Sequence, residues 1–127
     1  IVAADTLIEA PDGSAHGKPG DAAQARALLS SASGQRLKVL TGMAFIGPDG
    51  QLQHTVVISH VRMRHWAEPG LGDYIRSNHW RGCAGGFSIA SGSSPVELLD
   101  GEFDAVCGLS TRWLKTFFEP SAQGRRC

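Results

Sequence analysis

Residues 37–63 read LKVLTGMAFIGPDGQLQHTVVISHVRM, which is two apolar segments on either side of Pro48-Asp49-Gly50. Leu37–Ile46 and Gln51–Met63 are rich in the branched residues that favour strands. A Pro-Asp-Gly stretch between two such segments is typical of a hairpin turn. We therefore expect two long strands joined by a tight turn, the second of them long enough to be bent.

Further elements are expected on both sides of this pair. They are a buried strand at Ile1–Ile8, a helix from Ala22 to Ser33-Gly34 capped by Asp21, a short helix at Leu71–Ser77, a Gly-rich turn at His79–Gly86, a strand near Phe87–Ala90, a loop at Ser91–Pro95, a short strand at Val96–Leu99, and a helix at Leu109–Phe118 with Leu109, Trp113, Leu114 and Phe117 inward. Strands and helices are mixed rather than strictly alternating. We therefore expect an α/β fold bordering on α+β, with a mixed twisted sheet and flanking helices.

The composition is that of one ordinary globular domain. The chain has 127 residues, 42% hydrophobic and 19% charged, which excludes a highly charged disordered protein. Basic and acidic residues number 12 each, so no nucleic-acid partner is expected. Its short apolar runs predict no membrane partner, and its three cysteines favour a reducing, cytoplasmic location. We expect one domain over residues 1–118 and a frayed tail at 119–127.

The chain opens on Ile1-Val2-Ala3-Ala4-Asp5-Thr6, without an initiator Met before its first expected strand. We therefore expect a fragment, or a chain that has lost its first part. Asp5 is informative because a carboxylate at the inner end of an apolar strand is costly to bury unless it is paired or metal-bound. Two roles stay open for it: a structural capping acid, or an acid at the crevice where ligands of α/β proteins lie.

Three short patterns suit a phosphate ligand without requiring one. Gly17-Lys18-Pro19 combines close backbone approach, a point charge and a stiff turn, although it is no Walker loop. Thr41-Gly42 is a small pair at which a ligand or another backbone would come near. His60, Arg62 and Arg64 alternate along the later long strand, so they share one face. That row is either a solvated strand face or a phosphate-facing patch.

Cysteine and tryptophan side chains have structural interpretations beside functional ones. Cys107 is expected in the core, as a small apolar side chain. His79 and Cys83 are four residues apart, as zinc ligands can be, but the sequence offers no obvious fourth ligand. Trp80 is either a packing anchor or a platform on which a base stacks.

Short motifs in a fixed order carry a family resemblance. They are Ala3-Ala4-Asp5-Thr6, Gly17-Lys18-Pro19, Ala25-Arg26, Leu28-Leu29, Ser33-Gly34, Val39-Leu40-Thr41-Gly42, Val61-Arg62-Met63-Arg64, Tyr74-Ile75, Trp80-Arg81-Gly82, Ala84-Gly85-Gly86-Phe87, Gly101 and Val106-Cys107-Gly108-Leu109. No single motif is specific to one protein family, but the order of these motifs along the chain is. Together they make the sequence resemble the Maf family of nucleoside triphosphate pyrophosphatases.

The resemblance implies a fold, a reaction and a set of site residues. The family has an elongated two-lobed α/β fold, like that of inosine triphosphatases, with the nucleotide in a cleft. Its members use a divalent metal (Mg or Mn) to hydrolyse a nucleoside triphosphate to the monophosphate and pyrophosphate, and often form homodimers. By resemblance, Asp5 would activate water or hold the metal, and Lys18 would neutralise triphosphate charge. The implied substrate-binding residues are Thr6, Thr41, Gly42, Gly85, Gly86 and Phe87.

Departures from the family pattern leave a second function open. The family's opening Ser-x-x-Arg phosphate loop has no counterpart in this sequence. Its Lys-Ala-Gly reads Cys83-Ala84-Gly85, and its Gly-Ser-Tyr-Ser-Asn reads Gly101-Glu102-Phe103-Asp104-Ala105. A thiol would replace a cation at the cleft, and the added acids would repel a triphosphate. The alternative is therefore a non-catalytic Maf-fold descendant that serves as a binding or assembly module.

Overall fold

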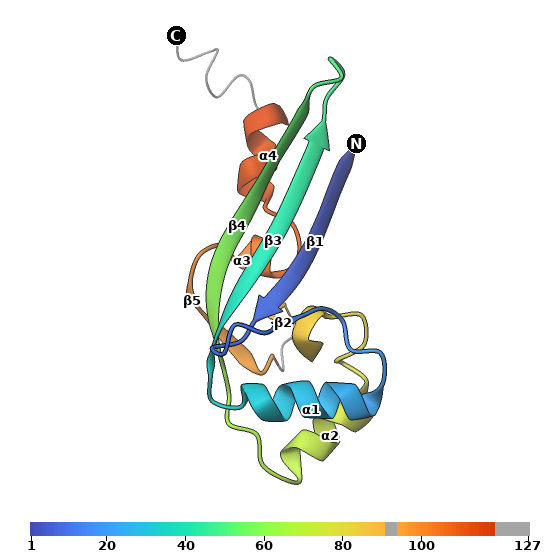
Figure 1. The fold of residues 1–127 in the computed structure, drawn as a ribbon, viewed down its shortest axis with the longest axis vertical. Coiled ribbons are helices and arrows are strands. Elements are labelled where there is room, and N and C mark those ends of the chain that lie inside the picture. Colours follow the sequence, from blue (N-terminus) through green and yellow to red (C-terminus); the bar gives the residue numbers. More distant parts are fainter. Residues whose placement is uncertain (91–93, 119–127) are drawn as a thin grey trace.

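The computed structural model describes residues 1–90 and 94–118, and Figure 1 shows an elongated molecule built on one sheet. A long antiparallel hairpin forms its centre, as residues 37–63 predict. The elements are β1 (Val2–Glu9), β2 (Ala15–His16), α1 (Ala22–Ala32), β3 (Arg36–Ile46), β4 (Leu52–Met63), α2 (Gly70–Ser77), the 3₁₀ turn η1 (Ala84–Gly86), β5 (Val96–Asp100), α3 (Phe103–Val106) and α4 (Thr111–Phe118). The strand order is β2-β1-β3-β4-β5.

The expected fold class, α/β bordering on α+β, is confirmed, although the sheet is not mixed. Every strand pair in the described residues is antiparallel. Figure 1 shows the reason, because α1 and α2 lie beyond one end of the sheet and not along its face. The chain therefore leaves β1 and enters β3 at the same end, as it does between β4 and β5.

One face of the sheet encloses the core. Alternate residues of β3 and β4 point to this face, and Leu37, Val61 and Met63 are each at most 2% exposed. Helix α1 adds Leu29 to this core at the lower end of the sheet in Figure 1. Helix α3 lies over the middle of the sheet, where Ala105 accepts a hydrogen bond from Thr41, and α4 lies toward the other end, where Phe45 stacks on Phe117 with 4.7 Å between ring centroids. The sheet thus links a lobe of α1 and α2 to a smaller group of α3 and α4.

The opposite face of the sheet carries exposed apolar side chains. Leu7, Val56 and Ile58 are 44%, 58% and 50% exposed. The expectation that the first strand is buried is wrong for this reason: β1 forms, but only Ile8 of it is buried. β2 pairs only with Ile8 and Glu9, so the described residues leave the rest of that edge of β1 without a neighbouring strand.

Local signals predict most of the remaining elements. Helix α1 begins directly after Asp21, whose carboxylate accepts a hydrogen bond from the Gln24 amide at 2.8 Å. The strand expected near Phe87–Ala90 is wrong. Gly85 and Gly86 both have positive φ in the preceding turn, and Phe87 packs into the core without strand pairing.

The C-terminal helix begins later than expected. Ser110 accepts a hydrogen bond from the Trp113 amide at 3.2 Å and so caps α4, which starts at Thr111. Leu109, expected inward, therefore precedes the helix and is 37% exposed. Trp113, Leu114 and Phe117 are partly buried. Helix α3 was not expected, since its four residues are too few to show a helical period.

Two expectations fall on parts of the chain that the structure does not describe. These are the frayed tail at 119–127 and residues 91–93 of the expected loop. None of the helices among the described residues has the length and apolar character needed to cross a membrane.

Candidate active site

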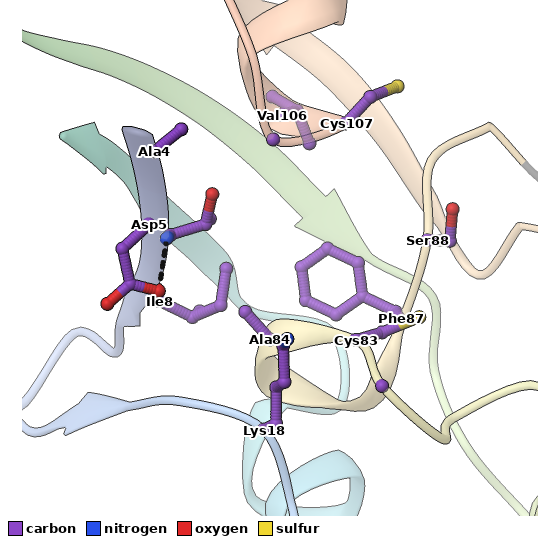
Figure 2. A pocket seen from close by; sticks show the side chains of 13 residues that line it. Ala4, Asp5, Ile8, Lys18, Cys83, Ala84, Phe87, Ser88, Val106 and Cys107 are labelled. Carbon is purple, nitrogen blue, oxygen red and sulfur yellow. Dashed lines mark hydrogen bonds between the residues drawn. The ribbon is translucent and has the colours of Figure 1, made fainter. Parts of the chain in front are cut away.

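A cavity of about 240 Å³ lies where β1, the loop before α1, the η1 turn and the end of α3 meet (Figure 2). The residues that line it include Asp5, Thr6, Lys18, Cys83, Phe87 and Cys107. Four segments that are far apart in the sequence therefore contribute to one site. Among them are both residues that the family resemblance marks as catalytic, Asp5 and Lys18.

Asp5 and Thr6 both border the cavity from β1, and as neighbours on a strand their side chains point to opposite faces of the sheet. The Asp5 carboxylate is exposed and accepts a hydrogen bond from the Thr6 amide at 2.9 Å. The expectation of a carboxylate at the buried inner end of a strand is wrong. Asp5 lies in the middle of β1, opposite Gly42 and on the open face of the sheet. It therefore needs no partner to offset a cost of burial.

Lys18 borders the cavity from the loop between β2 and α1. A backbone hydrogen bond from the Gly85 amide to the Gly17 carbonyl, 3.0 Å long, joins this loop to the η1 turn. Pro19, the next residue, is buried, whereas Lys18 is exposed. The loop is thus fixed at its backbone while the ammonium group remains available to an anion.

Cys83 faces the same cavity from the start of the η1 turn. Partial burial raises the pKa of its thiol, and the nearby Lys18 ammonium partly opposes this rise. The side chain is therefore a neutral thiol at neutral pH. Its sulfur lies 3.6 Å from the carbonyl oxygens of His79 and Arg81, to which the thiol can donate.

The structure does not bring four of the predicted substrate-binding residues to the cavity wall. Thr41 is fully buried on the core face of β3, and Gly42 lies on the opposite face. Gly85 packs against Ile8, since a Cβ there would lie 2.8 Å from Cγ1 of that residue. Gly86 accepts a hydrogen bond from the Tyr74 hydroxyl at 2.9 Å. Their contacts support the framework around the cavity, whereas Thr6 and Phe87 line it.

The comparison with known proteins identifies the family. A family model described as Maf-like protein matches residues 1–120. The chain belongs to the Maf family. A dTTP/UTP pyrophosphatase of Hyphomonas neptunium is 29% identical over 120 residues, which are 94% of this chain and 62% of that relative. A dTTP/UTP pyrophosphatase of Pyrococcus furiosus is 34% identical over 110 residues, 86% of this chain and 57% of that relative.

A third relative carries a broader name. The nucleoside triphosphate pyrophosphatase of Anaplasma phagocytophilum is 33% identical over 93 residues, which cover 72% of this chain and 48% of that protein. The Maf-family chain described here thus spans roughly half to three fifths of the length of the curated relatives it matches.

The cavity of this Maf-family chain has a wall that the sequence did not predict. Val106, Cys107 and Gly108 form it, at the end of α3. Cys107 was expected in the core, and this is wrong, because α3 turns its C-terminal end toward solvent and leaves Cys107 exposed. Partial burial raises the pKa of its thiol, and Asp104 raises it further. The Val-Cys-Gly motif belongs to the resemblance, but nothing in its residue types indicates a site.

A divalent metal fits this Maf site only with help from a ligand. No group of three His, Cys, Asp or Glu side chains among the described residues could hold an ion, which also removes the zinc interpretation of His79 and Cys83. Asp5 is the acidic residue among those that line the cavity, and its carboxylate lies on the open face of β1. Mg²⁺ is commonly held by one or two carboxylates together with substrate phosphates and water. Asp5 therefore fits as a single protein ligand to an ion that is held mainly by phosphate oxygens.

The two acids that depart from the Maf pattern do not face the cavity. Glu102 accepts a hydrogen bond from the Ser110 hydroxyl at 2.6 Å, and Asp104 accepts one from the Thr111 hydroxyl. Neither carboxylate lines the cavity. Hydrogen bonds thus engage both carboxylates outside the cavity, although Asp104 still acts on Cys107 at its wall, and Cys83 places a thiol at the cavity where the family resemblance implies a cation.

The row of basic residues on β4 and the buried tryptophan also lie away from the cavity. The imidazole of His60 forms a hydrogen bond with the Asp100 carboxylate at 2.7 Å, and the guanidinium of Arg62 donates to the carbonyl of Gly34. The guanidinium of Arg64 lies over the ring of Trp66. These contacts favour the solvated strand face over the phosphate-facing patch. Trp80 is 1% exposed, so it is a packing anchor and offers no surface to a base.

Proposed function

We propose that the protein hydrolyses a nucleoside triphosphate to the monophosphate and pyrophosphate at this cavity. The observation that carries the proposal is that Asp5 and Lys18, both exposed, border one cavity in a chain of the Maf family. The names of the relatives support a nucleoside triphosphate as substrate and make dTTP and UTP the first two to assay. The departure at Cys83 is the main argument against this function.

The proposed reaction is attack of water on the α-phosphorus. A bond forms between phosphorus and the water oxygen while the bond to the α–β bridging oxygen breaks, and pyrophosphate leaves with that electron pair. Asp5 accepts the proton that the water loses. The Lys18 ammonium pairs with the negative charge that grows on the departing pyrophosphate. Phe87, which is 5% exposed, gives the cavity an apolar floor that limits competing water.

Mg²⁺ or Mn²⁺ is the proposed cofactor, and Asp5 is the residue that would hold it. When bound, such an ion supplies positive charge that offsets the charge of the phosphates. Proton acceptor and metal ligand are alternative roles for Asp5. Paramagnetic resonance of Mn²⁺ with nucleotide and protein separates them: Asp5→Asn removes the protein-bound signal only if the carboxylate is a ligand.

Pyrophosphate release tests the function directly. The purified chain is incubated with Mg²⁺ or Mn²⁺ and each common nucleoside triphosphate, and both products are quantified. We expect monophosphate and pyrophosphate in equal amounts. Release of inorganic phosphate and diphosphate would show attack at the γ-phosphorus and would contradict the proposal.

The second candidate function is a nucleotide-binding module without turnover. The neutral thiol of Cys83 at the cavity favours it, because the resembling family places a cation there. Calorimetric binding of dTTP or UTP without product release would support this alternative. Absence of both binding and turnover would exclude both candidates.

Location and assembly follow as smaller proposals. Cys83 and Cys107 are free thiols in the part of the chain that the structure describes, which supports a reducing, cytoplasmic setting. We propose residues 1–118 as one domain, and analytical ultracentrifugation would test the homodimer that the family resemblance implies.

A further inference from the structure

The segment from Gly101 to Ser110 forms one wall of the cavity but has few apolar anchors. Within α3, Ala105 is buried, whereas Phe103 is 48% exposed. Leu109, just beyond the helix, is 37% exposed. Val106, which is half-buried, packs against the core, so the burial of apolar surface fixes this segment only in part.

Buried hydroxyl groups attach this segment to the sheet. Thr41, Ser59 and Ser110 are the buried polar residues in the described part of the chain, each 0% exposed. Thr41 donates to the Ala105 carbonyl at 2.6 Å, and the hydroxyl of Ser59 accepts from the Glu102 amide at 3.1 Å. Ser110 donates to the Glu102 carboxylate at 2.6 Å within the segment, and its backbone amide contacts the sheet at the sulfur of Met43, 3.1 Å away. A buried polar group is costly without a partner, so these bonds hold the segment at one position.

Thr41 also reaches the cavity through Thr6. The two residues lie opposite each other in the β1–β3 ladder, and their hydroxyl oxygens are 3.4 Å apart. A hydroxyl has one proton, and Thr41 gives its proton to the Ala105 carbonyl. Thr6 is therefore the donor in its contact with Thr41. The lone pairs of Thr6 remain for the cavity, which this residue lines.

We propose that Thr41, although it lies outside the cavity, is a positioning residue for the site. It holds the wall formed by Val106, Cys107 and Gly108, and it makes Thr6 a hydrogen-bond acceptor toward the ligand. Thr6 then recognises a hydroxyl or N–H group of the nucleotide and not a phosphate oxygen. The identity of the ligand rests on the proposed function, whereas the role of Thr41 in holding the wall does not.

Amide hydrogen exchange of the whole chain tests the wall without any ligand. Thr41→Val keeps the side-chain shape but removes the hydroxyl, and Thr41→Ser keeps the hydroxyl. Thr55→Val is the matched control, because Thr55 pairs with Met43 on the same face of the sheet. We expect Thr41→Val to speed exchange at residues 102–109 by roughly 5- to 30-fold, with Thr41→Ser and Thr55→Val close to wild type. Equal exchange rates at residues 102–109 in the wild type and the three variants would show that Thr41 does not hold the wall.

Affinity for dTTP with Mg²⁺, measured by calorimetry, tests the link to Thr6. We expect Thr6→Val and Thr41→Val each to weaken binding by roughly 5- to 30-fold, and the double variant to be no weaker than the worse single variant. If the two losses of affinity multiply in the double variant, Thr6 and Thr41 act independently, and the proposed link between them is wrong. If the wild-type chain binds no nucleotide, both the proposed function and the acceptor role of Thr6 are wrong. Hydrogen exchange, which needs no ligand, still shows whether Thr41 holds the wall.

Discussion

The backbone amide of Gly85 donates a hydrogen bond to the carbonyl of Gly17 at 3.0 Å. This bond joins the loop that carries Lys18 to the turn that carries Cys83, and both side chains consequently border one cavity. Gly85 has a φ of 68°, and a Cβ at this position would lie 2.8 Å from Cγ1 of Ile8. The contact therefore depends on glycine for its backbone conformation and for space.

Gly85→Ala should destabilise the protein more than Gly82→Ala. Both glycines have a similar positive φ, but a Cβ at Gly82 would meet nothing within 4 Å. The shared strain costs about 1–2 kcal/mol, and overpacking against Ile8 adds about 1–3 kcal/mol for Gly85→Ala alone. Urea unfolding of both variants measures the difference. Equal losses of unfolding free energy would show that Gly85 is not closely packed.

Cys83→Lys should increase turnover by roughly tenfold or more, because it adds a second fixed cation beside the developing phosphate charge. Cys83→Ser, which is neutral and similar in size, is the control and should leave turnover near that of the wild type. Steady-state kinetics of pyrophosphate release measures both. If the lysine variant is no faster than the serine variant, the cavity around Cys83 does not hold the phosphates.

Lys18→Ala should slow the alkylation of Cys83. The ammonium of Lys18 lowers the pKa of this thiol against the larger effect of burial, so its removal leaves less thiolate at a given pH. Iodoacetamide labelling at pH 8.5, read by peptide mass spectrometry, should slow by roughly two- to fivefold at Cys83. Cys107 serves as the internal reference, because its pKa depends on burial and Asp104. An unchanged rate at Cys83 would place Lys18 too far away to act on it.

Tyr74 should make stability depend on alkaline pH. Burial raises the pKa of Tyr74 to about 12, and its hydroxyl donates to the Gly86 carbonyl. A raised pKa in the folded state gives a contribution that is complete below about pH 10 and is lost as the pH rises through about 12. The stability advantage of wild type over Tyr74→Phe, about 1 kcal/mol at pH 8, should therefore shrink above pH 10. Urea unfolding at pH 8 to 11.5 measures it, and a constant advantage would contradict the assignment.

Local sequence signals predicted the elements whose cause is local. The β3–β4 hairpin follows from two branched apolar segments around Pro48-Asp49-Gly50, and the start of α1 follows from the carboxylate of Asp21. Phe87–Ala90 shows the limit of the apolar pattern. Phe87 and Ile89 are buried, at 5% and 8% exposure, as their composition indicates. Burial alone does not specify strand pairing, and here the residues pack as an irregular segment.

The site was only partly predictable because its parts meet through the tertiary fold. Asp5, Thr6, Lys18 and Phe87 were selected by family resemblance, and the structure brings them to one cavity. The face on which Asp5 lies depends on its register with β3, which its own segment does not encode. The exposure of Cys107 likewise depends on how α3 packs.

A direct test of the central claim is the rate of pyrophosphate release by Asp5→Asn, measured beside its melting temperature. Glu9→Gln is the matched control, since Glu9 is on the same strand and the same face but pairs with Lys38. If Asp5 takes the proton of the attacking water or holds the metal, Asp5→Asn should abolish turnover and leave melting close to wild type, while Glu9→Gln stays active. An Asp5→Asn protein that melts earlier but remains fully active would contradict the catalytic assignment and leave Asp5 as a structural acid.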